Sequence, residues 1–292
     1  MNNEKHYEAD LSCNNSVEIN EELFLSSYSI EDYDRPSVAT DIVSFSIRSE
    51  VEDSYRHNPK SNLSVLLIRR GEHPFINSWA LPGGFLRPYE TVEECAYREI
   101  KEETNISPNA LMPVGVFSKI NRDPRGRIIS NAFLSIITEE SVKAVGGYDA
   151  IEAKWFDVSF DCEDNGMYNL ILRNDNIELK AILKEKCSRF GKSEFEIIDS
   201  GNLAFDHAEI IATALTLLRK DVKNFELIFD FLPEKFTLNA LQKVQETVMN
   251  ISVLPANFRR KIADYVVETD EYTTGAGHRP AKLFKRKREV TK

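Results

Sequence analysis

The pattern of apolar and polar residues divides the chain into a polar start, a strand-rich middle and a helical end. Residues 1–36 are polar, acidic and rich in Asn, which is typical of a flexible arm. Residues 37–203 contain short runs of Val, Ile, Leu and Phe bounded by turn residues, and such runs predict strands. Residues 169–185 allow either a hairpin that turns at 173–176 or a strand followed by a helix. The predicted strands are 39–49, 61–71, 113–120, 128–138 and 152–158, with 79–85 as a strand end that enters a Gly-Pro turn.

One helix is well marked within the strand-rich middle. Thr91 followed three residues later by Glu94 forms the capping-box pattern of a helix start. Asn105 can adopt the left-handed conformation that ends a helix. A strand-rich body with one clear helix predicts an α+β fold.

From Phe205 onward, apolar residues recur at helical spacing. Three helices are predicted, with Asp206 and Thr237 as the N-caps of the first two. Two strands around a Gly-rich tip follow them. Three helices and a basic hairpin fit a winged helix-turn-helix domain, which we expect over residues 204–292, whereas the plainer alternative is a small helical tail with a solvated basic end. The predicted helices are 206–222, 237–249 and 255–265.

Composition narrows the class of protein. The sequence contains no run of eighteen apolar residues and no apolar signal region near its start, so we expect a cytoplasmic protein without a membrane span. Four scattered cysteines without CxxC spacing indicate free thiols and argue against a zinc site. The net charge is −10, yet residues 251–292 carry +5 and the remainder −15. This division suggests that the two ends meet different partners.

Three glutamates stand close together on the helix at 91–104. Glu99, Glu102 and Glu103 are spaced three and four residues apart, which destabilises an isolated helix. A run of charges is usually a solvated face, but Glu93, Glu94 and Lys101 already provide one on the other side. The glutamates continue the apolar sector instead, and inward carboxylates need compensating positive charge. Arg98 can neutralise one of them, or Glu90, and Mg²⁺ suits the rest because it prefers oxygen ligands.

The residues around these glutamates resemble the Nudix box. Gly84 is followed after five residues by Glu90, and after seven more by the run from Arg98 to Ile106. Asn105 stands where the family has Gly. The resemblance implies an α/β/α sandwich with a mixed sheet, and water attack on a nucleoside diphosphate linked to another group. It also implies Mg²⁺ or Mn²⁺ held by Glu99, Glu102 and Glu103 with help from the Gly83 carbonyl, and an ion pair between Arg98 and Glu90.

Other polar residues are weaker candidates for the same site. The resemblance implies a general base from a later loop, for which Asp149 is the first candidate and Glu152 the second, although both equally suit a turn and a strand edge. Arginines at a turn can bind a phosphate or ribose, or simply be exposed. The arginines of this turn are Arg122, Arg125 and Arg127. We expect Trp79 and Trp155 in the core and His207 in a helix start.

The basic C-terminal part is predicted to bind double-stranded DNA. A recognition helix can place Arg and Asn against bases and Lys against phosphate, while a basic wing contacts the backbone. The predicted helix residues are Asn257, Arg259, Arg260 and Lys261, and the predicted wing residues are Arg279, Lys282, Lys285 and Arg286.

A second resemblance covers roughly residues 37–288. LAFDHAEII, FTLNALQ, NFRRK and HRPAKLF, together with WALPGGF and RDPRGR, are similar to segments of the Nudix-related transcriptional regulators, NrtR. That family implies a homodimeric bacterial regulator of NAD or sugar metabolism genes, which senses ADP-ribose or a related metabolite and binds a palindromic operator. Because the charged residues of the box are retained, hydrolysis remains possible. The alternatives are a housekeeping ADP-ribose pyrophosphatase and a catalytically silent sensor.

Overall fold

The computed structural model describes residues 21–49, 61–108, 110–138, 150–189, 192–273 and 280–287. The chain falls into two units, Met1–Arg35 and Pro36–Lys292. In the first unit, the described residues form a short helix, α1 (Glu21–Ser27), and a 3₁₀ turn, η1 (Ile30–Asp32). Large apolar side chains such as Leu23 and Tyr33 are exposed there. The predicted arm at 1–36 and the predicted domain boundary at 203–204 stay predictions.

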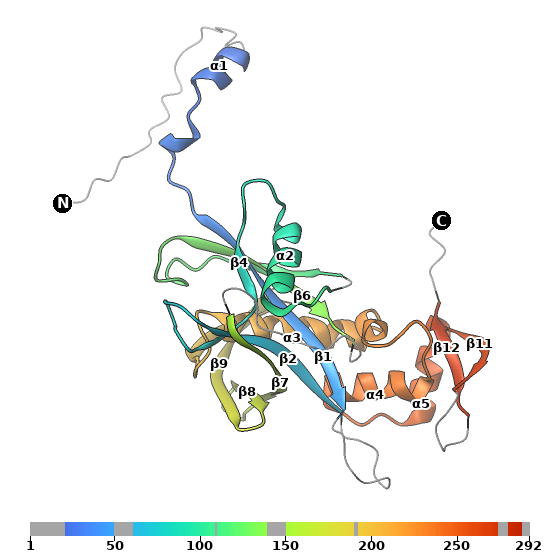
Figure 1. Ribbon diagram of the computed structural model, residues 1–292. Coiled ribbons are helices and arrows are strands. Elements are labelled where there is room, and N and C mark those ends of the chain that lie inside the picture. Colours follow the sequence, from blue (N-terminus) through green and yellow to red (C-terminus); the bar gives the residue numbers. More distant parts are fainter. Residues whose placement is uncertain are drawn as a thin grey trace. The chain divides into compact units, whose positions relative to one another are not determined.

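The second unit is built on a mixed sheet that has ten strands among the described residues (Figure 1). The strand order is β10-β9-β8-β7-β2-β1-β6-β5, with β3 paired to β2 and β4 paired to β1. β1 and β6 run parallel, whereas the other pairs are antiparallel. The strands are β1 (Ser37–Ser49), β2 (Ser61–Arg70), β3 (Trp79–Ala80), β4 (Gly83–Phe85), β5 (Met112–Phe117), β6 (Ile128–Ile136), β7 (Ala150–Cys162), β8 (Met167–Asn174), β9 (Ile177–Arg189) and β10 (Lys192–Asp199).

Helices cover both faces of this sheet. Successive side chains along a strand point to opposite sides, so each face has its own apolar residues for a helix to pack against. On one face, Ile42 of β1 packs against Ala96 and Ile100 of α2 (Val92–Thr104). On the other face, the neighbouring Val43 belongs to the main core, which includes the buried side of α3 (His207–Lys223). The α+β fold with a mixed sheet is therefore confirmed.

Most predicted strands are confirmed, and the ambiguous segment at 169–185 is a hairpin. β8 and β9 pair across a turn in which Asp175 has a φ of 40°. Trp79 and Trp155 are 3% and 5% exposed, so both lie in the core as expected. β10 was not predicted. It is an edge strand whose buried Phe195 alternates with charged residues, so its apolar signal is weak.

The helix α2 begins and ends where the sequence predicts. The Thr91 side chain accepts a hydrogen bond from the backbone N–H of Glu94, and the Glu94 carboxylate accepts one from the backbone N–H of Thr91. Asn105 has a φ of 56° and donates its backbone N–H to the carbonyl of Lys101. The capping box and the left-handed end are both confirmed. They fix where α2 begins and ends, and therefore the direction of each glutamate around the helix axis.

Asn105 provides a test of this helix end. An ordinary residue in the left-handed conformation costs about 1–2 kcal/mol relative to Gly. We therefore expect Asn105→Ala to lower the free energy of unfolding by about 1 kcal/mol, and Asn105→Gly to leave it within about 0.5 kcal/mol of wild type. Urea unfolding followed by circular dichroism measures both. An alanine variant as stable as wild type would contradict this account.

The C-terminal helices and hairpin also match the predicted winged-helix pattern (Figure 1). Thr237 caps its helix by accepting a hydrogen bond from the N–H of Ala240. Pro255 occupies the first turn of the third helix. Asp206 precedes α3 as predicted, but its side chain makes no capping hydrogen bond. The elements after α3 are η3 (Leu227–Phe231), α4 (Leu238–Met249), α5 (Pro255–Ile262), η4 (Ala263–Tyr265), β11 (Val266–Tyr272) and β12 (Lys282–Arg286).

The length and hydropathy of each helix show whether it could cross a membrane. Within the described ranges, none of the helices is both long and apolar enough to cross a bilayer.

Candidate functional site

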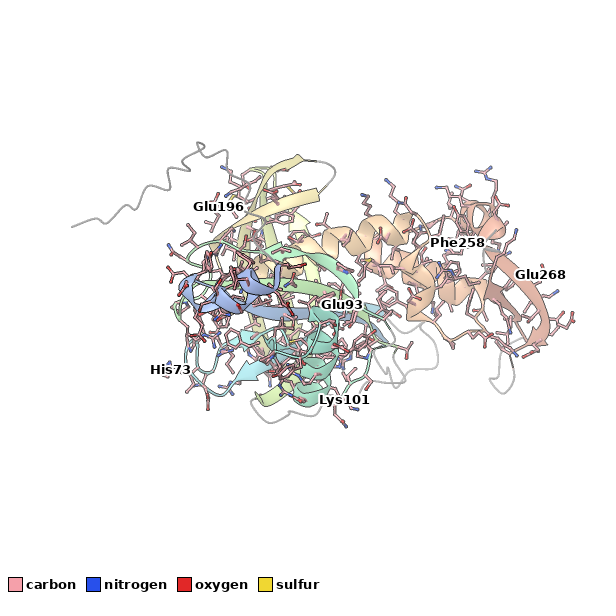
Figure 2. The ribbon with its side chains drawn as sticks, turned by 90° about the horizontal axis from the view of Figure 1, so that it is seen from above. His73, Glu93, Lys101, Glu196, Phe258 and Glu268 are labelled. Carbon is pink, nitrogen blue, oxygen red and sulfur yellow. The ribbon has the colours of Figure 1, made fainter. Side chains whose placement is uncertain are left out.

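Two glutamates of α2 line a pocket of about 260 Å³, which also includes residues of β1, β2, β4 and the loop before β6. Glu99 and Glu103 line this pocket. The side chain of Glu99 is 13% exposed and that of Glu102 48% exposed, while Glu103 is buried. Glu93 and Lys101, which are labelled in Figure 2, are exposed residues of the same helix. The predicted division of α2 is therefore confirmed only in part, because Glu99 and Glu103 lie inward as expected whereas Glu102 is exposed and does not line the pocket.

Two consecutive glycines bring the backbone of β4 against these carboxylates. The backbone N–H of Gly83 donates to Oε2 of Glu103 at 2.8 Å. A Cβ atom on Gly84 would lie 2.3 Å from Oε1 of Glu99, so any other residue there would displace that carboxylate from its present position. Burial raises the pKa of Glu99, and the hydrogen bond from Arg98 opposes the rise. Gly83 and Gly84 of the WALPGGF segment thus let the backbone approach the acidic helix closely.

Arg98 stands at the centre of the acidic group. Its guanidinium donates to both carboxylate oxygens of Glu90, at 2.6 and 2.9 Å. The same guanidinium contacts Glu99 at 2.5 Å and Glu102 at 3.2 Å. The hydrogen bonds from Arg98 are the main reason why the pKa of Glu90 falls to about 2. The structure therefore contains the predicted ion pair between Arg98 and Glu90, and Arg98 also holds two of the predicted metal ligands.

The donor set suits a hard divalent cation, because three carboxylates lie on adjacent turns of one helix. Among the described residues, no three His, Cys, Asp or Glu side chains are gathered tightly enough to hold a metal ion as they stand. The reason is visible in the contacts, since Arg98 binds Glu99 and Glu102 while Gly83 binds Glu103. A cation there would share Glu99 and Glu102 with Arg98.

The pocket also contains residues that the sequence did not single out. Arg70, at the end of β2, lines the pocket, and its Cζ atom lies 5.0 Å from the centre of the Phe205 ring. Arg125, predicted to bind ligand, lies 5.0 Å from the centre of the Phe85 ring and 5.5 Å from that of Phe205. Arg125 is also bound by both carboxylate oxygens of Asp123. Only folding brings these residues together, so no local signal could have found Arg70 or Phe205.

The contacts of the other two predicted ligand arginines favour structural roles. Arg122 is buried and donates to Asp206 at 2.7 and 2.8 Å and to Asp41 at 3.1 Å. Arg127 donates to the backbone carbonyls of Ser118 and Lys119. The turn at 121–130 therefore offers Arg125 alone, of its three arginines, with its guanidinium against the aromatic rings of the pocket.

Arg122 belongs to a cluster of four buried polar residues at the start of α3, comprising Asp41, Arg122, Asp206 and His207. His207 is the first residue of α3, as expected, and its Nδ1 accepts the backbone N–H of Leu81 at 2.8 Å. Its Nε2 lies 3.3 Å from the Asp41 carboxylate. Asp206 fails to cap α3 because Arg122 binds both of its carboxylate oxygens.

Neither candidate for the general base is placed in the pocket by the described residues. Asp149 lies outside the described ranges. Glu152 is on β7, where it pairs with Lys154 at 2.6 Å, and it does not line the pocket. The general base stays a prediction.

The basic face of α5 is the candidate nucleic-acid interface. Phe258, labelled in Figure 2, and Ile262 are buried, which leaves Asn257, Arg259 and Arg260 exposed on the other side. Lys261 is exposed as well. Within the described part of the chain, none of the three basic residues has a carboxylate within 4 Å. Their charge is therefore available to an anionic partner.

The wing residues are more constrained. Lys282 pairs with Glu268 at 2.5 Å, and Lys285 pairs with Glu234 at 3.0 Å. The guanidinium of Arg286 lies over the Phe229 ring. Arg279, the remaining predicted wing residue, lies outside the described ranges.

Comparison with known families defines the class of protein. Residues 53–160 match the NUDIX domain, and residues 228–285 match the NrtR DNA-binding winged helix domain. The protein is therefore a Nudix-domain protein that carries a second, DNA-binding domain. More particularly, it joins its Nudix domain to a winged helix of the NrtR type, as the sequence resemblance indicated.

Individual relatives cover either the whole arrangement or the Nudix part. The chain is 26% identical over 268 residues to the ADPR responsive transcriptional repressor NtrR of Acinetobacter baylyi, covering 91% of this chain and 88% of that protein. It is 47% identical over 95 residues to the ADP-ribose pyrophosphatase of Methanocaldococcus jannaschii, covering 32% of this chain and 55% of that protein. A crystal structure of a MutT/nudix family protein from Enterococcus faecalis superposes with a TM-score of 0.70 at 27% identity, covering 93% of this chain and 95% of that one.

Proposed function

We propose that this protein is a homodimeric transcriptional regulator whose Nudix domain binds ADP-ribose, or a related nucleoside diphosphate compound, and hydrolyses it with Mg²⁺ or Mn²⁺. The observation that carries the proposal is a single pocket in which Glu99 and Glu103 lie with Arg70 and Arg125. Carboxylates bind cations and arginines bind phosphates, so the pocket contains ligands for both the cation and the diphosphate of a cation-bound diphosphate.

The residues of the pocket have separate roles in this proposal. A divalent cation bound by Glu99, Glu102 and Glu103 would neutralise the diphosphate and lower the pKa of the attacking water. Arg98 holds Glu99 and Glu102 in orientation, and the Gly83 N–H fixes Glu103. The aromatic rings of Phe85 and Phe205 beside the arginines provide flat surfaces for a base or a sugar.

The relatives support ADP-ribose as the ligand. One is a repressor described as ADPR responsive and the other is an ADP-ribose pyrophosphatase. A homodimer would present two copies of α5 to a palindromic operator, as two-fold symmetric regulators do.

The first test separates hydrolysis from sensing. Purified protein is incubated with ADP-ribose and Mg²⁺, and AMP is measured by chromatography, with EDTA in place of Mg²⁺ as the control. We expect AMP only with the cation. Binding of ADP-ribose in calorimetry without any AMP release would support the catalytically silent sensor instead. If the protein neither binds ADP-ribose nor releases AMP from it, ADP-ribose is refuted as the ligand.

The basic face of α5 predicts the result of a DNA-binding test. Each good base contact by Arg is worth about 1–3 kcal/mol, so Arg259→Ala with Arg260→Ala should weaken operator binding by at least about 10-fold. Gel shifts at several salt concentrations with the DNA upstream of the protein's own gene measure this effect. AMP release should be unchanged.

The control for this test removes the same amount of charge from another helix. Lys220 and Lys223 are exposed on α3, and their replacement by Ala should leave the gel shift nearly as in wild type. If the α5 variant and the α3 variant behave alike, or if wild type gives no salt-dependent complex, the DNA-binding half of the proposal fails. The housekeeping pyrophosphatase would then be the better account.

A further inference from the structure

A pocket of about 810 Å³ lies between the end of β6 and the hairpin of β11 and β12. None of its lining residues lines the pocket beside α2. Its volume falls in the range of about 300–1,000 Å³ that is typical of small-molecule sites, which often lie where two domains meet. The sheet and the winged-helix part therefore border a hollow that the proposed nucleotide site does not use.

The walls of this pocket are mainly apolar. Leu134 of β6, Phe229 of η3 and Phe236 of the loop before α4 line it and are buried. Met112 of β5 and the exposed Val267 of β11 extend the apolar surface toward solvent. A large apolar or aromatic group bound here would remove that surface from water, which favours binding.

Most of the charged residues in the lining already have partners. Glu268, labelled in Figure 2, pairs with Lys282 at 2.5 Å, and Glu234 pairs with Lys285 at 3.0 Å. A ligand would have to displace these ion pairs to gain a charge from them. The charges offered to a ligand therefore come from the two other ionisable residues of the lining.

Those two residues are Asp230 and Arg286, and both are partly exposed. Over the ranges that the structure describes, neither has an oppositely charged side chain within 4 Å. Partial burial raises the pKa of Asp230, and the positive charge of Arg286 opposes that rise. The guanidinium of Arg286 lies over the Phe229 ring. The two opposite charges therefore act on each other across a gap, without direct contact.

We propose that this pocket binds a zwitterionic α-amino acid with a large apolar side chain. The ligand carboxylate accepts hydrogen bonds from Arg286, and the ligand ammonium donates to Asp230. The apolar side chain lies against Leu134, Phe229 and Phe236. A simple anion would satisfy Arg286 alone and a simple cation Asp230 alone, so only a ligand with both charges matches both residues.

The position of this site gives it a separate role from the nucleotide pocket. Leu134 belongs to the sheet, whereas Arg286 belongs to the hairpin that the sequence predicts as a DNA-binding wing. A bound amino acid therefore contacts both parts of the protein. The inference does not rest on the ligand proposed for the pocket beside α2.

The test measures binding to the full-length protein by ligand-observed NMR titration. The probes are L-phenylalanine, phenethylamine, which lacks the carboxylate, and phenylpropionate, which lacks the ammonium. Each analogue should bind about 10-fold more weakly than L-phenylalanine, a difference of about 1.4 kcal/mol. L-alanine should also bind at least about 10-fold more weakly, because it leaves the apolar walls uncovered.

Two substitutions at the pocket should divide these probes. Arg286→Gln should weaken the binding of L-phenylalanine and phenylpropionate by about 10-fold and leave phenethylamine within about 2-fold of wild type. Asp230→Asn should weaken L-phenylalanine and phenethylamine by about 10-fold and leave phenylpropionate within about 2-fold. This crossed pattern assigns one end of the ligand to each residue.

Neighbouring residues provide a matched control for each substitution. Lys287 follows Arg286, and Glu226 precedes Asp230 by four residues. Both are exposed, and neither lines the pocket. Lys287→Gln and Glu226→Gln remove the same charges and should leave L-phenylalanine binding within about 2-fold of wild type, a change below about 0.5 kcal/mol.

The site is overturned if wild type, verified as folded by circular dichroism, does not bind L-phenylalanine or binds both analogues as tightly. It is also overturned if the two pocket variants lose all three probes equally, or behave as the two controls do. Excess ADP-ribose should not displace L-phenylalanine. Displacement would place the amino acid in the pocket beside α2 and refute this assignment, whereas failure of ADP-ribose to bind would refute only the proposed nucleotide ligand.

Discussion

Replacing Glu102 with Gln is expected to lower AMP release from ADP-ribose by about 100-fold or more, with little change in thermal stability. Charge stabilisation by a bound cation contributes several kcal/mol to such reactions, and each 1.4 kcal/mol is a factor of ten in rate. Glu102 is the most exposed of the three glutamates, with 48% of its side chain accessible. Its contacts in the described structure are with Arg98 and Arg87, and exposed ion pairs contribute only about 0–1 kcal/mol.

The control for this substitution lies on the same helix. Glu93→Gln removes an equal charge from the exposed face of α2 and should leave AMP release within about 2-fold of wild type. Calorimetry in EDTA should show that Glu102→Gln still binds ADP-ribose, because the phosphate contacts proposed for Arg70 do not involve it. Equal activity of the Glu102 and Glu93 variants would mean that the acidic stripe holds no catalytic cation.

The second large effect is expected at Arg122. Arg122→Met should lower the free energy of unfolding by about 3–5 kcal/mol, because it leaves Asp41 and Asp206 buried without their cation. Urea unfolding at pH 7 measures this difference. Arg127→Met is the matched control, since Arg127 is exposed and donates only to backbone carbonyls, and its cost should stay below about 1 kcal/mol.

The pH dependence of this effect has a definite sign. Burial alone would raise the pKa of Asp41, but His207 and Arg122 outweigh it and hold that pKa well below its usual range. A lowered pKa contributes stability that is complete above about pH 4 to 5 and is lost as the pH falls further. Wild type should therefore lose stability toward low pH more steeply than Arg122→Met. Parallel curves for the two proteins would show that Asp41 is not held by this arginine.

The acidic helix could be predicted from the sequence because its signals are local. Thr91, Glu94 and Asn105 set its start and end within a few residues of one another, and the spacing of the glutamates then fixes which way they point. Nothing in that inference needed tertiary structure. The same holds for Thr237 at the start of α4.

The arginines could not be assigned in the same way. The turn around Asp123 and Gly126 suggests exposure for all three of its arginines, but Arg122 is buried by Asp41 and Asp206, which come from distant parts of the chain. The sequence around Arg70 shows only that it lies at the end of a strand, and nothing in it indicates a place in a pocket. Whether a guanidinium is paired, exposed or directed into a pocket depends on partners that only the fold brings together.

Helix α3 has a consequence for how this protein can be divided. Its first residue, His207, lines the pocket beside α2, while Arg219 near its other end donates to the carbonyl of Phe160 in β7 and to that of Val248 in α4. The apolar side of α3 belongs to one continuous core with both the sheet and the later helices. If the chain were divided before or after α3, the fragment without α3 would expose the apolar surface that α3 covers. The ligand-binding and DNA-binding parts therefore share a structural element, and neither should be stable when expressed alone without it.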